Sequence, residues 1–373
     1  MKILCERDRL SEAVSVVSRA VSGHSSMPVL EGICFRAEAN GTLTLMGNDL
    51  EIGIEAKIAA TVAVPGEVVL NAKMIGGIIR TLPADQISIE VNEKNVALIK
   101  SGAAKFEIAG IPGGDFPDLP VVDSDYSISL PGGLLKEMIA KTMFAVASTD
   151  NNPILTGCLL EIQNTGLTMV ALDGYRMALR RATLKNDFEE KRMIIPGKSL
   201  GELSRILSDG EDPVRIDATG RHAIFIFDGY RMVTRLIEGN YMNYQSVIPK
   251  ESTIELTCSA AKMNESIQRA SLIILNDLVK SPVKFQIEDG NINISCSTMA
   301  GSVDDNIPVD IKDASLEIGF YNRYLLEAFR VVDTETVRLQ FNSPTSPLVI
   351  VPPKGAGEED FLYLILPLRL KAD

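Results

Sequence analysis

A serine bracketed by glycines is the residue pattern with the most direct chemical meaning. Gly197-Lys198-Ser199-Leu200-Gly201 matches G-x-S-x-G, the turn that presents the nucleophile of many hydrolases. Such a serine needs a histidine base, and the chain has two histidines, His24 and His222. His222 falls in the polar turn Gly220-Arg221-His222 and is not on a long catalytic loop. The pattern alone therefore gives weak support for catalysis.

Phosphate-loop and metal chemistry have still less support. The segment Gly197-Lys198-Ser199 resembles the end of a phosphate-binding loop, but the first glycine of that motif is replaced by Arg192. The five cysteines, at positions 5, 34, 158, 258 and 296, are scattered and form no C-x-x-C pair. Acidic dipeptides such as Asp304-Asp305 and Glu358-Glu359 are typical of solvated surface. We predict no catalytic residue, no metal and no cofactor, and a reducing cytoplasm as the setting.

Basic residues recur in pairs at one spacing along the chain. The pairs, each 125 residues after the last, are Lys73 with Arg80, Lys198 with Arg205, and Arg323 with Arg330. Seven residues are about two helical turns, so the two side chains of a pair lie on one helix face. A single pair is well explained as a solvated helix face. Three pairs in register favour one basic surface made three times.

Three amphipathic helices are predicted to position these pairs, over residues 71–82, 197–207 and 322–332. Their apolar stripes repeat in the same register: Ile75, Ile78 and Leu82; Leu200, Leu203 and Leu207; Leu325, Ala328 and Val332. The basic pairs fall opposite these stripes and point away from the core. The register also places Ser199 at the position of Met74 and Tyr324, so the same turn exists without a nucleophile. This weakens the hydrolase hypothesis.

The helices belong to a larger repeat of helix, strands, second helix and strands. Each unit opens with another helix, whose stripes are Leu10, Val14, Val17 and Val21; Leu135, Ile139 and Val146; and Met263, Ile267 and Ile274. The outward faces of these opening helices mix basic and acidic residues, so they are weaker candidates for a basic surface. Strand-like stretches include 28–32, 153–157, 42–45, 167–170 and 291–294. The sequence thus predicts an α+β fold with units over 1–124, 125–252 and 253–373.

Two copies of Asp-Gly-Tyr-Arg-Met stand out, at 173–177 and 228–232. Asp-Gly favours a tight turn, and we predict a turn in both places.

The net charge of −12 argues against a generally basic nucleic-acid binder, but it leaves room for one basic face. No apolar run approaches the ~18 residues of a membrane helix. The first residues lack the organisation of an export signal, so we expect no export, and we expect no membrane partner.

Across its whole length the chain resembles the bacterial beta sliding clamp, the processivity subunit of DNA polymerase III holoenzyme. The motifs that carry the resemblance are Pro28-Val29-Leu30, Asp49-Leu50-Glu51, Asp115-Phe116-Pro117, Asp173-Gly174-Tyr175-Arg176 and Leu366-Pro367-Leu368-Arg369-Leu370. The resemblance implies the DNA-clamp fold: two subunits join head to tail in a ring, with helices lining the hole and sheets outside. It implies a non-enzymatic protein that encircles duplex DNA without reading its sequence, through the six repeated basic residues.

The resemblance also implies a hydrophobic cleft for short peptide motifs of the polymerase alpha subunit, the clamp loader and repair proteins. By motif, the cleft residues are Leu155, Gly174, Tyr175, Arg176, Met177, Met242, Val247, Ser346, Leu364, Ile365, Leu366, Pro367 and Leu368. The implied homodimer seam places Phe106 and Ile108 of one subunit against Leu272 and Ile273 of the other. Lys100 and Lys105 are expected to pair there with Asp304 and Asp305.

Four residues depart from the common family pattern. Met242 stands where a proline is usual, and His24 stands where an arginine often contacts DNA. Pro153 and Ile154 replace aromatic residues. Peptide preference and DNA contact at these positions are therefore open, although His24 is kept as a candidate DNA contact. Two other hypotheses remain: a hydrolase that uses Ser199, and a repeat scaffold that binds only proteins.

Overall fold

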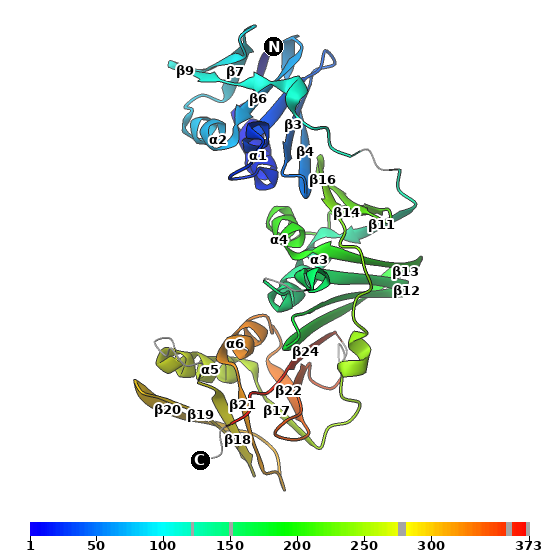
Figure 1. Cartoon of the computed structure of the whole chain (residues 1–373), viewed down its shortest axis with the longest axis vertical. Helices are drawn as coiled ribbons and strands as arrows, with labels where there is room; N and C mark the ends of the chain where they lie inside the picture. The colour runs from blue at the N-terminus through cyan, green and yellow to red at the C-terminus, as the bar shows by residue number, and fades with distance from the viewer. Residues whose placement is uncertain (121–122, 149–151, 275–280, 356–359, 371–373) are drawn as a thin grey trace. The chain divides into compact units, whose positions relative to one another are not determined.

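The computed structural model describes residues 1–120, 123–148, 152–274, 281–355 and 360–370 (Figure 1). The chain packs as two compact units. The first contains Met1–Lys136 and Glu202–Leu236, and the second contains Glu137–Gly201 and Ile237–Asp373. Each unit therefore combines one terminal repeat with part of the central repeat. The boundaries predicted near 124 and 252 describe the sequence repeat and stay a prediction.

Two antiparallel sheets form the first unit, with two helices packed on them. The larger sheet has nine strands in the order β10-β6-β2-β3-β4-β16-β15-β14-β11. These are Ile111–Pro112, Gly66–Asn71, Gly32–Ala37, Thr42–Asn48, Ile52–Ala59, Tyr230–Arg235, His222–Phe227, Pro213–Ala218 and Tyr126–Pro131. The smaller sheet runs β5 (Thr61–Val64), β1 (Lys2–Glu6), β7 (Gln86–Val91), β8 (Val96–Ser101) and β9 (Ala104–Ala109). Helix α1 (Arg7–Val17) contacts β4 and α2 (Ala72–Thr81).

The second unit repeats this plan. Its larger sheet has the order β12-β13-β24-β23-β22-β17, with bounds Gly157–Leu172, Arg176–Pro196, Phe361–Ile365, Leu348–Val351, Thr336–Phe341 and Ile254–Ser259. Its smaller sheet runs β20 (Gly301–Pro308), β19 (Asn291–Thr298), β18 (Val283–Glu288) and β21 (Leu316–Phe320). Helix α5 (Ala260–Ile274) packs against α6 (Asn322–Arg330) and β19. Helices α3 (Gly132–Thr142) and α4 (Gly197–Ile206) belong to the central repeat.

The predicted helices form because their apolar stripes have a buried surface to cover. Ile75, Ile78 and Leu82 are buried, as are Leu200, Leu203 and Leu207. In the third copy Leu325 and Ala328 are buried, whereas Val332 lies beyond the end of α6 and is half-buried. The α+β class predicted from the sequence is confirmed. Within the described residues, none of the helices is long and apolar enough to cross a membrane.

Two stretches predicted as strands are not strands. Residues Pro28–Glu31 and Pro153–Thr156 each form a short 3₁₀ helix that leads into a strand at Gly32 or Gly157. Proline fixes φ near −65° and has no N–H to donate to a sheet, so it favours the first turn of a helix. The correction applies to both copies in the same way, and the repeat itself is preserved.

Candidate functional site

All six repeated basic residues are exposed on their helices. Lys73 and Arg80 lie on α2, and the corresponding residues lie on α4 and α6: Lys198, Arg205, Arg323 and Arg330. On α2, Lys73 and Arg80 line a cavity of about 650 Å³ together with His24. The remaining lining is rich in serine, including Ser15, Ser18 and Ser22. The structure therefore brings together three of the predicted DNA contacts within the first unit.

Intramolecular contacts engage several of these cations. Arg323 pairs with Glu327 one turn along α6, at 2.9 Å, and Arg205 pairs with Glu202 on α4. The Arg80 Nε donates a hydrogen bond to the Gly76 carbonyl at 3.1 Å. Exposed pairs of this kind contribute little stability and exchange readily, so the guanidinium groups remain able to turn to another anion.

The opening segments of the repeats carry cations that are more firmly engaged. Arg19 pairs with Glu202 at 3.1 Å, and Lys136 pairs with Asp209 at 2.8 Å. Lys141 is buried between Glu137 and Asp333, at 2.8 and 2.7 Å. These pairs explain why the second helix of each repeat is the better candidate for binding a polyanion.

The first Asp-Gly-Tyr-Arg-Met forms the turn that joins β12 to β13. The Asp173 carboxylate accepts hydrogen bonds from the backbone amides of Tyr175 and Arg176, at 3.0 and 3.1 Å. Gly174 has φ +87°, a left-handed conformation that favours glycine. Leu366 follows β24 and donates its amide to the Tyr175 carbonyl at 2.9 Å. Two predicted cleft segments are thereby fixed side by side.

Arg176 lies beneath this turn and not on its surface. Its side chain is 5% exposed and pairs with Asp173 at 3.0 Å and with Glu327 of α6. The guanidinium also lies 4.5 Å from the ring centroid of Tyr324 and 5.6 Å from that of Phe144. Burial acts to raise the pKa of Glu327, but hydrogen bonds and charge from Arg176 and Arg323 hold this pKa below its usual range. Arg176 therefore supports the surface above it.

The predicted cleft residues divide into a buried group and an exposed group. Met177, Leu364 and Ile365 are buried, and Leu155 is partly buried against the same apolar cluster. Pro367, Leu368 and Ser346 are half-buried, and the Ser346 hydroxyl lies 2.7 Å from that of Ser343. The exposed apolar side chains are Tyr175 (62%), Met242 (45%), Val247 (42%) and Leu366 (40%). We call these four residues the Tyr175 surface.

Sequence reasoning missed the residues of α6 that support this surface. The Tyr175 ring stacks on Tyr324, with centroids 6.4 Å apart, and Tyr324 meets Tyr321 edge to face at 4.9 Å. Tyr321 directly precedes α6, and Tyr324 and Glu327 follow it at intervals of three residues, so the last two lie on neighbouring turns of one helix face. This spacing indicates one face of a helix. Nothing in the neighbouring sequence shows that this face contacts a turn about 150 residues earlier in the chain.

The residues predicted for a subunit seam lie on or near edge strands. β9 carries Phe106 and Ile108 at the edge of its sheet, and β20 is the edge of another. Phe106 is 37% exposed and Leu272 on α5 is 67% exposed, whereas Ile108 is buried and Ile273 is half-buried. Edge strands leave backbone groups unpaired and thus offer a template for another strand.

Two of the four predicted seam charges, Lys105 and Asp305, have ion-pair partners within the chain. Lys105 pairs with Glu107 at 3.1 Å, and Asp305 pairs with Arg269 at 2.5 Å. Hydrogen bonds and charge from Arg269 hold the pKa of Asp305 below its usual range, although its burial opposes this. If these residues formed the seam, each would bind a charged residue of the other subunit in addition to, or in place of, its partner within the chain.

Ser199 has no access to a substrate, because it is 1% exposed on α4. The second Asp-Gly-Tyr-Arg-Met makes a hairpin turn between β15 and β16, with Asp228 and Gly229 at φ +43° and +78°. A turn is thus confirmed at both copies.

The cysteines are poor nucleophiles. Burial raises the pKa of Cys5, Cys34, Cys158 and Cys258 to about 12. In the described part of the chain, no three His, Cys, Asp or Glu side chains are grouped to hold a metal ion, and Glu358-Glu359 lie outside that part.

Comparisons with known proteins agree over the whole chain. Models for the N-terminal, central and C-terminal domains of the DNA polymerase III beta subunit match residues 1–120, 129–243 and 245–369. The beta sliding clamp of Bacillus subtilis is 33% identical, with 99% of this chain and 100% of the relative covered. That of Halalkalibacterium halodurans is 32% identical at the same coverage.

Solved structures give the same result. A beta subunit from Eubacterium rectale superposes with a TM-score of 0.94 at 35% identity, covering 99% of this chain and 100% of that one. A clamp from Pseudomonas aeruginosa bound to griselimycin has a TM-score of 0.92 at 26% identity and the same coverage. With its repeated basic helices, its paired sheets and these matches over its full length, the chain belongs to the DNA polymerase III beta subunit family, the beta sliding clamps.

Proposed function

We propose that this sliding clamp works as a head-to-tail homodimeric ring around duplex DNA in the cytoplasm. As a beta sliding clamp the chain is a non-catalytic processivity subunit. The observation that carries the proposal is the set of six exposed cations at equivalent positions of α2, α4 and α6. Cations on a repeated helix face match phosphates without contacting base edges, which permits movement along DNA. The acidic remainder of the chain, net charge −12, disfavours DNA on other faces.

Ring closure would join the β9 edge of one subunit to the β20 edge of the next. Phe106 and Leu272, exposed in the single chain, would then be covered with Ile108 and Ile273. Closure also protects two edge strands from uncontrolled pairing. Native mass spectrometry at micromolar concentration is expected to give twice the 40.5 kDa chain mass. A Phe106→Asp, Leu272→Asp double variant should be monomeric, and a monomeric parent protein would contradict the ring.

The Tyr175 surface is proposed to dock short apolar peptide motifs of the polymerase alpha subunit, the clamp loader and repair proteins. Its support is the four exposed apolar side chains, of which Tyr175 stacks on Tyr324 beside the ion-paired Arg176 and is joined to Leu366 by a backbone hydrogen bond. Aromatic and aliphatic anchors dominate the energy of such contacts. Tyr175→Ala is expected to weaken binding of a polymerase peptide about tenfold or more and to leave the dimer intact. Unchanged peptide affinity would place the docking site elsewhere.

The basic helices are tested by salt dependence. A Lys73→Ala, Lys198→Ala, Arg323→Ala triple variant loses one exposed cation per repeat. Because the dimeric ring then loses six cations, we expect the slope of log affinity against log salt, for a short duplex, to fall by up to about 5. A Lys94→Ala, Lys185→Ala, Lys312→Ala control removes the same charge from outside these helices. If both variants change the slope equally, the helices are not the DNA-binding face, as expected for a scaffold that binds only proteins.

A further inference from the structure

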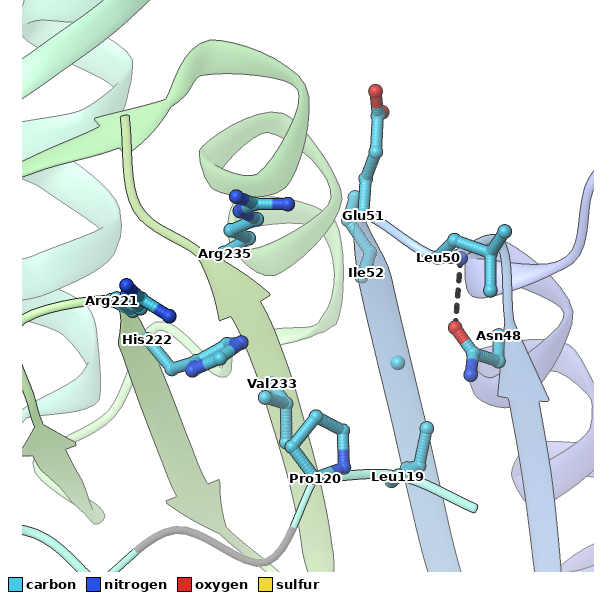
Figure 2. A pocket seen from close by; sticks show the side chains of 11 residues that line it. Asn48, Leu50, Glu51, Ile52, Leu119, Pro120, Arg221, His222, Val233 and Arg235 are labelled. Carbon is cyan, nitrogen blue, oxygen red and sulfur yellow. Dashed lines mark hydrogen bonds between the residues drawn. The ribbon is translucent and has the colours of Figure 1, made fainter. Parts of the chain in front are cut away.

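A second cavity lies within the first unit, at the tips of two strand turns. Its volume is about 290 Å³, and its lining includes Leu50 and Leu119 together with Arg221, His222 and Arg235. Figure 2 shows Arg221, His222 and Arg235 together on one side of the strand that carries Ile52, with Leu50 on its other side. Leu119 and Pro120 close its lower end in this view. Nothing in the proposed clamp function uses this cavity.

The turn beside the cavity has the same backbone as the turn of the Tyr175 surface. Asp49 donates its amide to the Ile52 carbonyl at 3.1 Å, as Asp173 does to Arg176 at 3.2 Å. The Asp49 carboxylate accepts from the amides of Glu51 and Ile52, at 3.0 and 2.7 Å. The second residue of each turn has a left-handed φ, +74° at Leu50 and +87° at Gly174. The two turns are therefore equivalent members of the repeat.

Strand pairing extends the equivalence across both sites. The amide of Arg235 donates to the Glu51 carbonyl at 3.2 Å, and that of Leu366 donates to the Tyr175 carbonyl at 2.9 Å. Ala223 pairs with Thr234 in one sheet, and Leu348 pairs with Ile365 in the other. Arg235 thus takes the place of Leu366, and Arg221 takes that of Ser346. The cavity is the counterpart of the Tyr175 surface, with basic residues at apolar or neutral positions.

We propose that this cavity, the Arg235 pocket, is a second docking site, for a short peptide segment in which a carboxylate side chain adjoins an apolar one. Guanidinium groups bind carboxylates through paired, charge-assisted hydrogen bonds. Leu50, at the opposite end of the lining, supplies an apolar anchor, because this residue is 62% exposed. Glu51 also lines the pocket, and its carboxylate points away from His222 and Pro120 (Figure 2).

Charge and size select this occupant. Basic side chains gathered in a chain of net charge −12 attract an acidic segment and disfavour a basic one. A cavity of about 290 Å³ holds one or two side chains and not a length of duplex. The comparison of the two sites rests on the proposed peptide role of the Tyr175 surface. The expected binding of a carboxylate in the Arg235 pocket depends only on the residues that line the pocket.

The test measures the two sites separately. In a Tyr175→Ala, Leu366→Ala background, fluorescence polarisation follows binding of a fluorescein-labelled Leu-Glu-Leu-Glu amide to the full dimer. We expect saturable binding that Arg235→Glu weakens about tenfold or more. A Leu-Lys-Leu-Lys amide should bind the Arg235→Glu protein better than the Arg235 protein. This charge-reversal rescue cannot result from misfolding, and Arg235 is exposed.

Three results would overturn the pocket. The first is that the Tyr175→Ala, Leu366→Ala protein no longer binds the acidic peptide at all. The second is that neither Arg235→Glu nor Arg221→Glu changes the affinity for the acidic peptide. The third is that the Leu-Lys-Leu-Lys amide does not bind the Arg235→Glu protein better than the Arg235 protein. If a short DNA strand instead binds with the same dependence on Arg235 and excludes the peptide, the site belongs to nucleic acid and the proposal is wrong. Failure of the Tyr175 surface is read independently, from binding of a purely apolar Leu-Phe peptide to the otherwise unchanged protein.

Discussion

The turns at Asp49 and Asp173 share a backbone and differ in what lies beneath them. Below the second turn, Arg176 is buried between two carboxylates and two aromatic rings. Below the first, the equivalent residue is Ile52, which is fully buried. Above them the chemistry is reversed, with apolar side chains at the Tyr175 surface and basic ones at the Arg235 pocket. One repeated scaffold thus carries two different recognition surfaces, because side chains rather than backbone set the chemistry.

The largest difference between the turns is expected from removing the buried cation. Arg176→Ala leaves Asp173 and Glu327 without their main partner and should destabilise the second unit by about 3–5 kcal/mol. Hydrogen exchange of β13 and β24 is the measurement, because unfolding of a chain with two units is not two-state. Arg192→Ala, which breaks an exposed pair with Glu161, is the matched control and should cost less than about 1 kcal/mol. Equal effects would show that the buried network is not special.

A smaller difference is expected at the aspartates. Asp173→Ala loses two backbone hydrogen bonds and the pair with Arg176, whereas Asp49→Ala loses the two equivalent backbone bonds. We expect about 2–3 kcal/mol for the first and about 1–2 kcal/mol for the second. The measurement is the hydrogen-exchange rate of the backbone amides that donate to each carboxylate. The rate should rise more in the Asp173→Ala variant than in the Asp49→Ala variant. The reverse order would mean that the turn hydrogen bonds outweigh the buried charge.

The left-handed residues provide a still finer test. A Cβ at Gly174 meets no atom within 4 Å, so Gly174→Ala should cost about 1 kcal/mol from its φ alone. Leu50→Gly removes the same strain at the equivalent position and is expected to change stability by less than about 0.5 kcal/mol, because the added chain entropy opposes the gain. Hydrogen exchange of the strands that flank each turn, β3 with β4 and β12 with β13, measures both changes. A stabilising Gly174→Ala would contradict the backbone equivalence.

Acid should affect the two turns unequally. The pKa of Glu327 is below its usual range in the folded chain, as are those of Glu137 and Asp333 in the same unit. A carboxylate with a lowered pKa stabilises the fold fully above its unfolded pKa, near 4.5 for glutamate, and loses that contribution as pH falls through the folded value. Below about pH 4.5, β13 and β24 should therefore exchange sooner than β4 and β16. Glu327→Gln should reduce this acid dependence, and an unaltered dependence would exclude Glu327 as its cause.

Features set by local periodicity were predictable from the sequence. The stripes of the second helices and the turns at Asp173 and Asp228 depend on residues a few positions apart. Pro28–Glu31 was misread as a strand because its apolar residues outweighed the proline. The burial of Arg176 could not be predicted, since it depends on Glu327, 151 residues later. Nor does any local pattern predict the hydrogen bond from the Arg235 amide to the Glu51 carbonyl, which joins strands far apart in the sequence.

Retention on closed DNA tests the central claim most directly. After loading on a nicked circular plasmid, the protein should remain bound at a salt concentration that abolishes binding to short duplexes, because a ring is held by topology. Cutting the plasmid once should release it, because the ring can then slide off an end. Equal retention on circular and linear DNA, or equal loss from both at high salt, would contradict encirclement.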